Sequence, residues 1–218
     1  MVNVTVTAIE DPERALALSY APADRRAALH ALFALDAALG QVLRTTREPM
    51  VGQMRLAWWR EALVRLDTAP PPGEPVLQAL AATVLPVGPT GEALSAMVDG
   101  WEPLLGAIDA RAIADHGRLR GAVLFGQAGA VLGATGDQVS EAGQGWALAD
   151  LAGHLSDPAL AAHARDAAMP LLAAAGARRW SRAGRALGAL THSARLDLVA
   201  PATPRRVARL AWHRVTGR

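Results

Sequence analysis

The chain of 218 residues contains no cysteine and no lysine. Without cysteine, disulfide bonds and thiol chemistry are excluded, and a reducing compartment is compatible with the sequence. Without lysine, all 22 basic residues are arginines, which explains an isoelectric point near 10.2 at a net charge of only +2. The high isoelectric point therefore reflects the kind of basic residue and not a large excess of positive charge.

Neither the charge pattern nor the N-terminus points to a nucleic acid or to secretion. The arginines are distributed among 20 acidic residues, so we expect no nucleic-acid partner. The first ten residues, MVNVTVTAIE, have no basic start and no apolar stretch of signal-peptide length. We therefore expect a cytoplasmic protein, with a peripheral position at the inner membrane as the alternative.

The hydrophobic pattern predicts an all-α protein. No strand pattern of any weight occurs after Ala8, and apolar residues recur at helical spacing along most of the chain. We expect residues 1–218 to form one domain, a bundle of roughly eight to ten helices. Besides two helices within residues 29–66, helices are predicted over about residues 75–85, 90–105, 110–134, 138–155, 178–199 and 204–215, and Pro170 is expected to break or kink a further one.

The first long helix carries a carboxylate in the middle of its apolar face. Leucines, a valine and Phe33 recur at helical spacing until little polar surface is left, so the helix is predicted to be mostly buried. Asp36 falls inside this stripe. An ionised carboxylate there is costly unless a cation, a metal or several hydrogen-bond donors meet it.

The second long helix places a base in a similar setting. Arg55 falls inside an apolar arc, and we predict that Asp36 forms a salt bridge with an arginine in place of a metal, with Arg55 as the first candidate. The alternative is that both side chains reach solvent at the edge of their stripes. Of Trp58 and Trp59, we expect one to pack in the core and the other to line a pocket.

A third polar group lies on the helix predicted over residues 138–155. Asp150 and His154 are one turn apart and share a face with Trp146. Such a local pair is most often solvated, and as a metal site it is short of ligands. We include both residues among the candidates for ligand binding.

The last predicted helix, residues 204–215, is basic and amphipathic. Most helices of this kind dock on their own domain, but one with a tryptophan at its border can also lie on an anionic membrane surface. The predicted apolar side consists of Val207, Leu210, Ala211 and Val215, with Trp212 at the border, opposite Arg205, Arg206 and Arg209.

Four segments resemble the squalene/phytoene synthase family. They are RAALHALFALD (Arg26 to Asp36), QMRLAWWREAL (Gln53 to Leu63), EPVLQAL (Glu74 to Leu80) and AVLFGQAGAVLG (Ala122 to Gly133). Each match is weak alone, but their order makes the resemblance fairly specific. It implies the isoprenoid-synthase fold, a helical bundle around a central cavity.

The resemblance also implies a chemistry from which this sequence departs. Active members join two prenyl diphosphates head to head, and two aspartate-rich motifs on opposing helices hold the magnesium that binds the diphosphates. One turn after Asp36, where further aspartates are expected, the chain has Gly40 and Gln41. In the second motif region, Asp150 is the one candidate carboxylate before Asp157. Head-to-head synthesis is therefore not expected.

A non-catalytic branch of the family fits better. The segment Ala34 to Val42, followed by Glu48 and GQMRLAWW (Gly52 to Trp59), is similar to the branch that contains the mitochondrial complex I assembly factor. This resemblance implies a binding or assembly protein without a catalytic residue, metal or cofactor, whose partners would be a prenyl or lipid ligand, respiratory complex I subunits, or a membrane surface. The expected ligand-binding residues are Asp36, Gln41, Arg55, Trp58, Trp59, Asp150 and His154.

Two other hypotheses remain open at this stage. A divergent prenyltransferase with magnesium would require Asp36, Asp150 and Arg55 to converge on one cavity. A purely structural interaction module would instead have a dry interior filled by side chains.

Overall fold

The computed structural model describes residues 12–134, 136–199 and 204–218, and none of these residues forms a strand. The all-α fold class is therefore confirmed. The α-helices are α1 (Pro12–Leu18), α2 (Arg26–Thr45), α3 (Pro49–Arg65), α4 (Pro75–Thr83), α5 (Gly91–Asp99), α6 (Ala110–His116), α7 (Ala122–Leu132), α8 (Val139–His154), α9 (Pro158–Ala177), α10 (Arg185–Val199) and α11 (Pro204–Thr216). Two short 3₁₀ turns, Leu85–Val87 and Glu102–Leu104, and one π-helical turn, Gly117–Gly121, complete the set.

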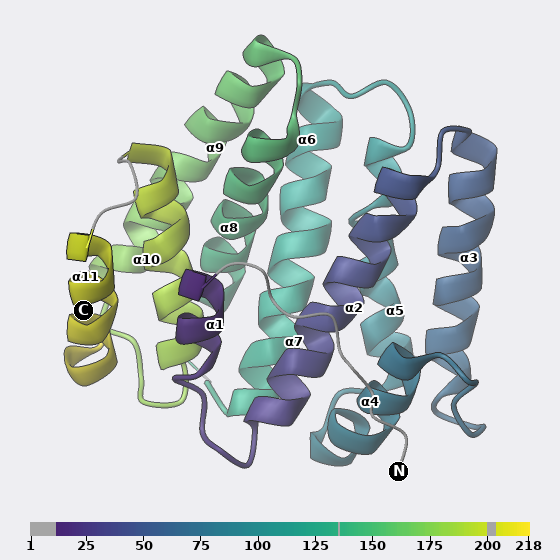
Figure 1. The fold of residues 1–218 in the computed structure, drawn as a ribbon, viewed down its shortest axis with the longest axis horizontal. Coiled ribbons are helices and arrows are strands. Elements are labelled where there is room, and N and C mark those ends of the chain that lie inside the picture. Colours follow the sequence, from purple (N-terminus) through teal and green to yellow (C-terminus); the bar gives the residue numbers. More distant parts are fainter. Residues whose placement is uncertain (1–11, 135, 200–203) are drawn as a thin grey trace.

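The helices form an elongated bundle with α3 and α11 at opposite ends of its long axis (Figure 1). Between these ends, α8 packs against α7, α9 and α10, while α2 packs against α3, α4 and α7. Buried apolar residues from Ala17 to Leu210 join into one core cluster. The centre of the bundle is therefore built from α2, α7 and α8.

The helix α2 is buried because apolar residues occupy most of its circumference. Leu29, Leu32, Leu35 and Leu39 have no exposed surface, and Asp36 is buried among them. By length and composition α2 could cross a membrane, but 56% of its most apolar window is buried inside the bundle. A core helix passes the same test, and a central carboxylate is expensive in a bilayer.

The helices α6 and α7 are joined without a loop by the π-helical turn Gly117–Gly121. Two glycines let this turn approach its neighbour closely. A Cβ atom on Gly121 would lie 2.1 Å from the carbonyl oxygen of Gly143 on α8, and one on Gly143 would lie 2.0 Å from the carbonyl oxygen of Gly121. Backbone contact of this kind excludes any larger residue and fixes the turn against α8.

Two predicted helix features differ from the structure, namely the break at Pro170 and the start of the helix predicted over residues 178–199. The helix α9 continues through Pro170 without a break, and its alanine-rich side is buried against the bundle, so tertiary packing outweighs the loss of one backbone hydrogen bond. The helix α10 begins at Arg185 and not near Arg178. The residues before it instead bury Trp180, whose backbone N–H donates to the carbonyl oxygen of Gly217 at 2.8 Å.

Candidate functional site

A buried ion pair joins α2 to the π-helical turn at the centre of the bundle. The guanidinium of Arg120 donates two hydrogen bonds to the carboxylate of Asp36, from Nε to Oδ1 and from Nη2 to Oδ2, each 2.7 Å long. Asp36 is 2% exposed and Arg120 is 3% exposed. This bidentate geometry is the strongest arrangement available to an arginine and a carboxylate. It explains how the carboxylate of Asp36 can be buried in the apolar stripe of α2.

The same guanidinium also binds a carboxylate from α8. Arg120 Nη1 donates to Asp150 Oδ2 at 2.6 Å. Burial raises the pKa of Asp150, but the positive charge and hydrogen bond of Arg120 outweigh burial and hold the pKa below its usual value. Burial likewise lowers the pKa of Arg120, while Asp36 and Asp150 more than reverse this effect. Arg120 and Asp150 are therefore both charged at neutral pH.

His116, at the end of α6, completes the hydrogen bonds of the cluster. Its Nδ1 lies 2.6 Å from the carbonyl oxygen of Gly100, and its Nε2 lies 3.2 Å from Arg120 Nη1. Because an arginine can only donate, Nε2 must accept and the proton must be on Nδ1. Burial and the nearby Arg120 lower the pKa of His116 to about 4. The imidazole is thus a neutral acceptor at physiological pH.

Two indole rings enclose the guanidinium. The central carbon of Arg120 lies 4.3 Å from the centre of the Trp101 ring and 4.8 Å from that of Trp146. These aromatic faces attract the cation and exclude water from it. The Nε1 atom of Trp101 is buried and has no hydrogen-bond partner in the structure. We call Asp36, His116, Arg120 and Asp150, with the two tryptophans, the central cluster.

The central cluster borders a small hollow. This cavity of ≈200 Å³ lies between α1, α8 and α10, and Asp150 and Trp146 form part of its wall. Arg14 from α1 also lines it, with its guanidinium carbon 4.8 Å from the centre of the Trp146 ring. The remaining lining residues are Ala149, Leu190, Ser193, Ala194 and Asp197.

Comparison with known proteins identifies the first half of the chain. Residues 9–115 match the family model described as squalene/phytoene synthase, and this segment includes α2 with Asp36. This segment of the chain is similar to the squalene/phytoene synthase family. Searches of curated proteins and of solved structures each gave no match. The matched segment covers just under half of the chain and ends before Arg120 and Asp150.

The metal-binding side chains that the structure brings together do not fit the magnesium that the family resemblance implies. Residues 12–134, 136–199 and 204–218 contain no group of three or more histidine, aspartate or glutamate side chains placed to hold a metal ion. The two carboxylates at the centre, Asp36 and Asp150, are both already bound to one guanidinium. A magnesium ion would have to displace Arg120 from between them, since oxygen ligands must face the ion directly.

The prediction that Asp36 forms a salt bridge with an arginine is confirmed, but the partner is Arg120 and not Arg55, the first candidate. Arg55 is exposed, and its Nη1 donates to the hydroxyl oxygens of Thr45 and Thr46 at 2.9 and 2.8 Å. The apolar arc around Arg55 is interrupted, because Val51 and Trp58 on the same helix also face outward. Sequence periodicity therefore overestimated the burial of α3.

The other predicted site residues lie in different places. Trp59 is 9% exposed and packs in the core, whereas Trp58 is 48% exposed and lines a separate surface hollow of ≈280 Å³ beside Pro70 and Pro72. Gln41 is exposed and accepts a hydrogen bond from Arg44 Nε at 3.0 Å. Of the seven residues predicted to bind a ligand, the structure joins only two, Asp36 and Asp150, through Arg120.

His154 is near Asp150 but outside the central cluster. It is exposed, and its Nδ1 lies 2.7 Å from the backbone carbonyl oxygen of Asp150. The predicted Asp150–His154 pair is thus a local backbone contact at the end of α8. Ligand roles for His154, Gln41, Arg55 and Trp58 stay predictions.

The sequence analysis missed Arg120 and His116, although a signal was present. Ile113, His116, Arg120 and Leu124 recur at helical spacing, so the two polar residues share an apolar stripe, as Asp36 does on α2. The sequence pattern could not show that Arg120 is the salt-bridge partner of Asp36. Arg120 and Asp36 are 84 positions apart, and only the tertiary packing of the bundle brings them together.

Proposed function

We propose that this squalene/phytoene synthase-like protein is a non-catalytic binding protein that serves in the assembly of a respiratory complex. The observation that carries the proposal is the position of Arg120 between Asp36 and Asp150. A fixed cation there takes the place that divalent ions hold in active synthases, so the bundle keeps its architecture but has no means to bind diphosphate through a metal.

The physical argument concerns the leaving group. Diphosphate departs with several negative charges, and hard cations held by several carboxylates must gather that charge before the carbon–oxygen bond breaks. Here the charges of Asp36 and Asp150 are neutralised by Arg120, and Arg14 adds a further positive charge near Asp150. Breaking the Asp36–Arg120 pair to admit a metal would leave buried charges unpaired, at a cost of roughly 3–5 kcal/mol.

The hollows favour a protein partner over a deeply buried prenyl ligand. The hollow beside Asp150 measures ≈200 Å³ and the hollow beside Trp58 measures ≈280 Å³. Sites for small organic ligands usually measure about 300–1,000 Å³. The hollow beside Asp150 is also walled by charged side chains from Arg14 and Asp197 as well as by apolar ones. A lipid-like ligand remains part of the proposal only where it contacts the surface.

The identity of the partner rests on the resemblance to the branch that contains the complex I assembly factor. Under this proposal the protein contacts respiratory complex I subunits from the cytoplasmic side, peripherally at the inner membrane. Deletion of the gene is expected to lower NADH–quinone oxidoreductase activity in isolated membranes, and re-expression of the wild-type protein is expected to restore it. Unchanged complex I activity and abundance in the deletion strain would contradict the assembly role.

The absence of catalysis is tested with the purified protein. It is incubated with prenyl diphosphates and magnesium, and released pyrophosphate and extracted products are measured beside an active phytoene synthase. We expect pyrophosphate release at the level of the protein-free control. Lipid extraction and mass spectrometry of the same preparation show whether a ligand is carried. Magnesium-dependent release by the wild type that is lost in Asp36→Asn would overturn the proposal.

A divergent prenyltransferase is the second candidate, because the two carboxylates do converge on one place. Asp36 and Asp150 contact the same guanidinium, as the family's two motif positions would contact the same metal cluster. Arg55, the third group this hypothesis needed, lies elsewhere on the surface. The turnover assay above distinguishes the two candidates.

A further inference from the structure

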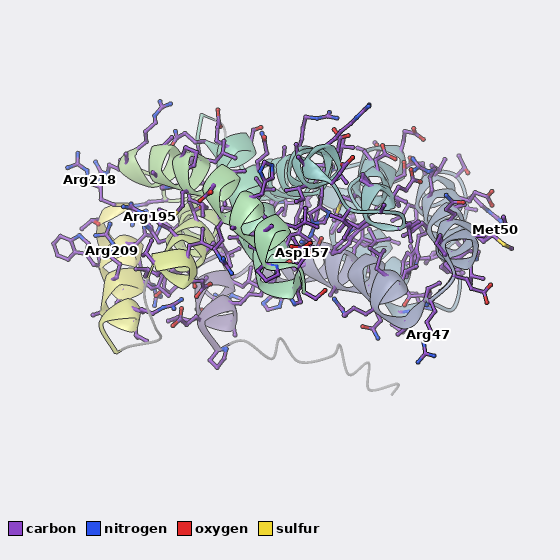
Figure 2. The ribbon with its side chains drawn as sticks, turned by 90° about the horizontal axis from the view of Figure 1, so that it is seen from above. Arg47, Met50, Asp157, Arg195, Arg209 and Arg218 are labelled. Atoms are coloured by element: carbon purple, nitrogen blue, oxygen red, sulfur yellow. The ribbon has the colours of Figure 1, made fainter. Side chains whose placement is uncertain are left out.

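The C-terminal end of the protein carries most of the positive charge. Residues 178–218 contain ten of the 22 arginines but one acidic residue, Asp197, of the 20. The even mixing of charges expected above therefore fails for this segment, while acids outnumber arginines in the rest of the chain. Figure 2 shows Arg195, Arg209 and Arg218 together at one end of the molecule, with Arg47 and Met50 at the other. The exposed arginines of the segment are Arg178, Arg179, Arg182, Arg195, Arg209, Arg214 and Arg218.

The helix α11 is fixed to the domain through one face. Arg206, Leu210 and His213 are buried, and the guanidinium of Arg206 forms salt bridges with Glu13 on α1 and Asp197 on α10. This is not the face that the sequence pattern indicated. The helix docks with Leu210 and Arg206 on the same side, because carboxylates of α1 and α10 neutralise the arginine.

The opposite face of α11 is exposed and apolar. Val207, Trp212 and Val215 are 50%, 59% and 76% exposed. At 100° per residue these side chains span an arc of roughly 140°, which also includes Ala208 and Ala211. We call these five residues the outward sector.

Arginines border the outward sector on both sides. On the helical wheel, Arg209 follows Trp212 at one edge and Arg214 precedes Val207 at the other, while exposed Arg218 lies beyond the end of α11. The helix itself contains no acidic residue. An apolar sector with an arginine at each edge and a third beyond the helix end matches the layers of a lipid surface, with acyl chains beneath and anionic headgroups beside the helix.

We propose that the outward sector and its bordering arginines dock the protein on an anionic lipid membrane, with α11 lying in the plane of the surface. Val207, Trp212 and Val215 enter the boundary between headgroups and acyl chains, while Arg209 and Arg218 contact lipid phosphates. A nucleic acid would satisfy the arginines but not the exposed apolar side chains, so the lipid surface is favoured. This contact does not depend on whether the protein is catalytic or assembles a complex.

The molecule offers a control at its other end. Met50, Met54 and Trp58 form a second exposed apolar stripe along α3, with exposed fractions of 72%, 68% and 48%. Exposed Glu48 and Glu61 lie beside that stripe together with exposed Arg47 and Arg55, so the charges there are mixed and the complementarity to anionic lipid is weaker. The two stripes have similar apolar content and differ mainly in the charges beside them.

The test is flotation of the full-length protein with vesicles of phosphatidylcholine alone or mixed with phosphatidylglycerol. We expect binding to the mixed vesicles, little binding to phosphatidylcholine alone, and weakening as salt is raised. The triple variant Val207→Gln, Trp212→Gln and Val215→Gln, which leaves the docking face of α11 intact, is expected to lose about tenfold or more of the binding. The matched control is Met50→Gln, Met54→Gln and Trp58→Gln, which should bind like the wild type.

A charge variant makes the test independent of the apolar substitutions. Replacing Arg209 and Arg218 with glutamine is expected to weaken binding to the mixed vesicles about tenfold or more, since each arginine near such a surface contributes about a fivefold factor. Arg47→Gln with Arg165→Gln is the control for net charge. Equal binding to both vesicle types, equal losses in variant and control, or binding to a DNA fragment without vesicle binding would each overturn the proposal.

Discussion

Gly100 lies directly against the backbone of Arg120. A Cβ atom on Gly100 would be 2.3 Å from the backbone nitrogen of Arg120 and 2.5 Å from its Cα atom. The carbonyl oxygen of Gly100 also accepts the hydrogen bond from His116 Nδ1. The missing side chain at the end of α5 therefore sets the position of the π-helical turn, and with it the guanidinium between Asp36 and Asp150.

Gly100→Ala is predicted to destabilise the protein by about 1–3 kcal/mol, because a methyl group there must push the backbone of Arg120 away from α5. The φ of Gly100 is −71°, so backbone conformation alone does not oppose alanine. Urea unfolding measures the change. Gly106→Ala is the control, since nothing lies within 4 Å of a Cβ atom at that position. Equal effects of the two substitutions would show that steric contact with Arg120 is unimportant.

Arg120→Met is predicted to cost about 3–5 kcal/mol of unfolding free energy, because it leaves the carboxylate of Asp36 buried without a cation. The double variant Asp36→Leu with Arg120→Met should lose clearly less than the sum of the two single variants. Chemical denaturation of all four proteins gives the coupling energy. Arg60→Met serves as the surface comparison, since Arg60 also binds two carboxylates, Asp99 and Glu102, but is partly exposed. Additive losses at Asp36 and Arg120 would argue against a coupled buried pair.

Stability is predicted to fall as the pH decreases from about 6.5 to 4. Burial lowers the pKa of His116 and His213 to about 4 and that of His192 to about 3, against an ordinary value of 6.5. Within this window the unfolded chain binds protons that the folded chain does not. Each such histidine therefore removes about 1.4 kcal/mol of stability per pH unit, and the loss is absent above pH 6.5.

The contribution of His116 can be isolated with His116→Gln. Its unfolding free energy is measured by urea denaturation from pH 4 to 8. It should depend less steeply on pH than that of the wild type, because unfolding of the variant takes up about one proton fewer. Glutamine should lower stability at pH 8, because the bridge between Gly100 and Arg120 is altered. The same replacement at exposed His163 is the control. A wild-type stability that is flat between pH 6.5 and 4 would refute the assignment of neutral buried histidines.

Arg55→Ala is predicted to change the unfolding free energy by less than about 1 kcal/mol, because the lost hydrogen bonds to Thr45 and Thr46 are exposed to solvent. Thermal unfolding is a sufficient measurement. A loss similar to that of Arg120→Met would mean that Arg55 shares the buried site.

Much of the bundle was predictable because helical periodicity is a local property. The burial of α2, the helices before Pro170 and the buried carboxylate of Asp36 all follow from residues within a few turns of each other. The prediction failed where contacts with other helices determine whether a segment is helical. Pro170 stays within α9, whose alanine-rich side is packed against the bundle. Before α10, the backbone N–H of Trp180 instead donates a hydrogen bond to the carbonyl oxygen of Gly217.

The sequence by itself determined that this protein is an all-α bundle with an acid in its core. Only the tertiary structure decided which arginine meets Asp36 and which face of α11 remains exposed. Periodicity can indicate that a charge is buried, but its partner depends on close approach between distant segments. That approach is set here by Gly100 and Gly121, whose missing side chains allow Arg120 to reach both carboxylates.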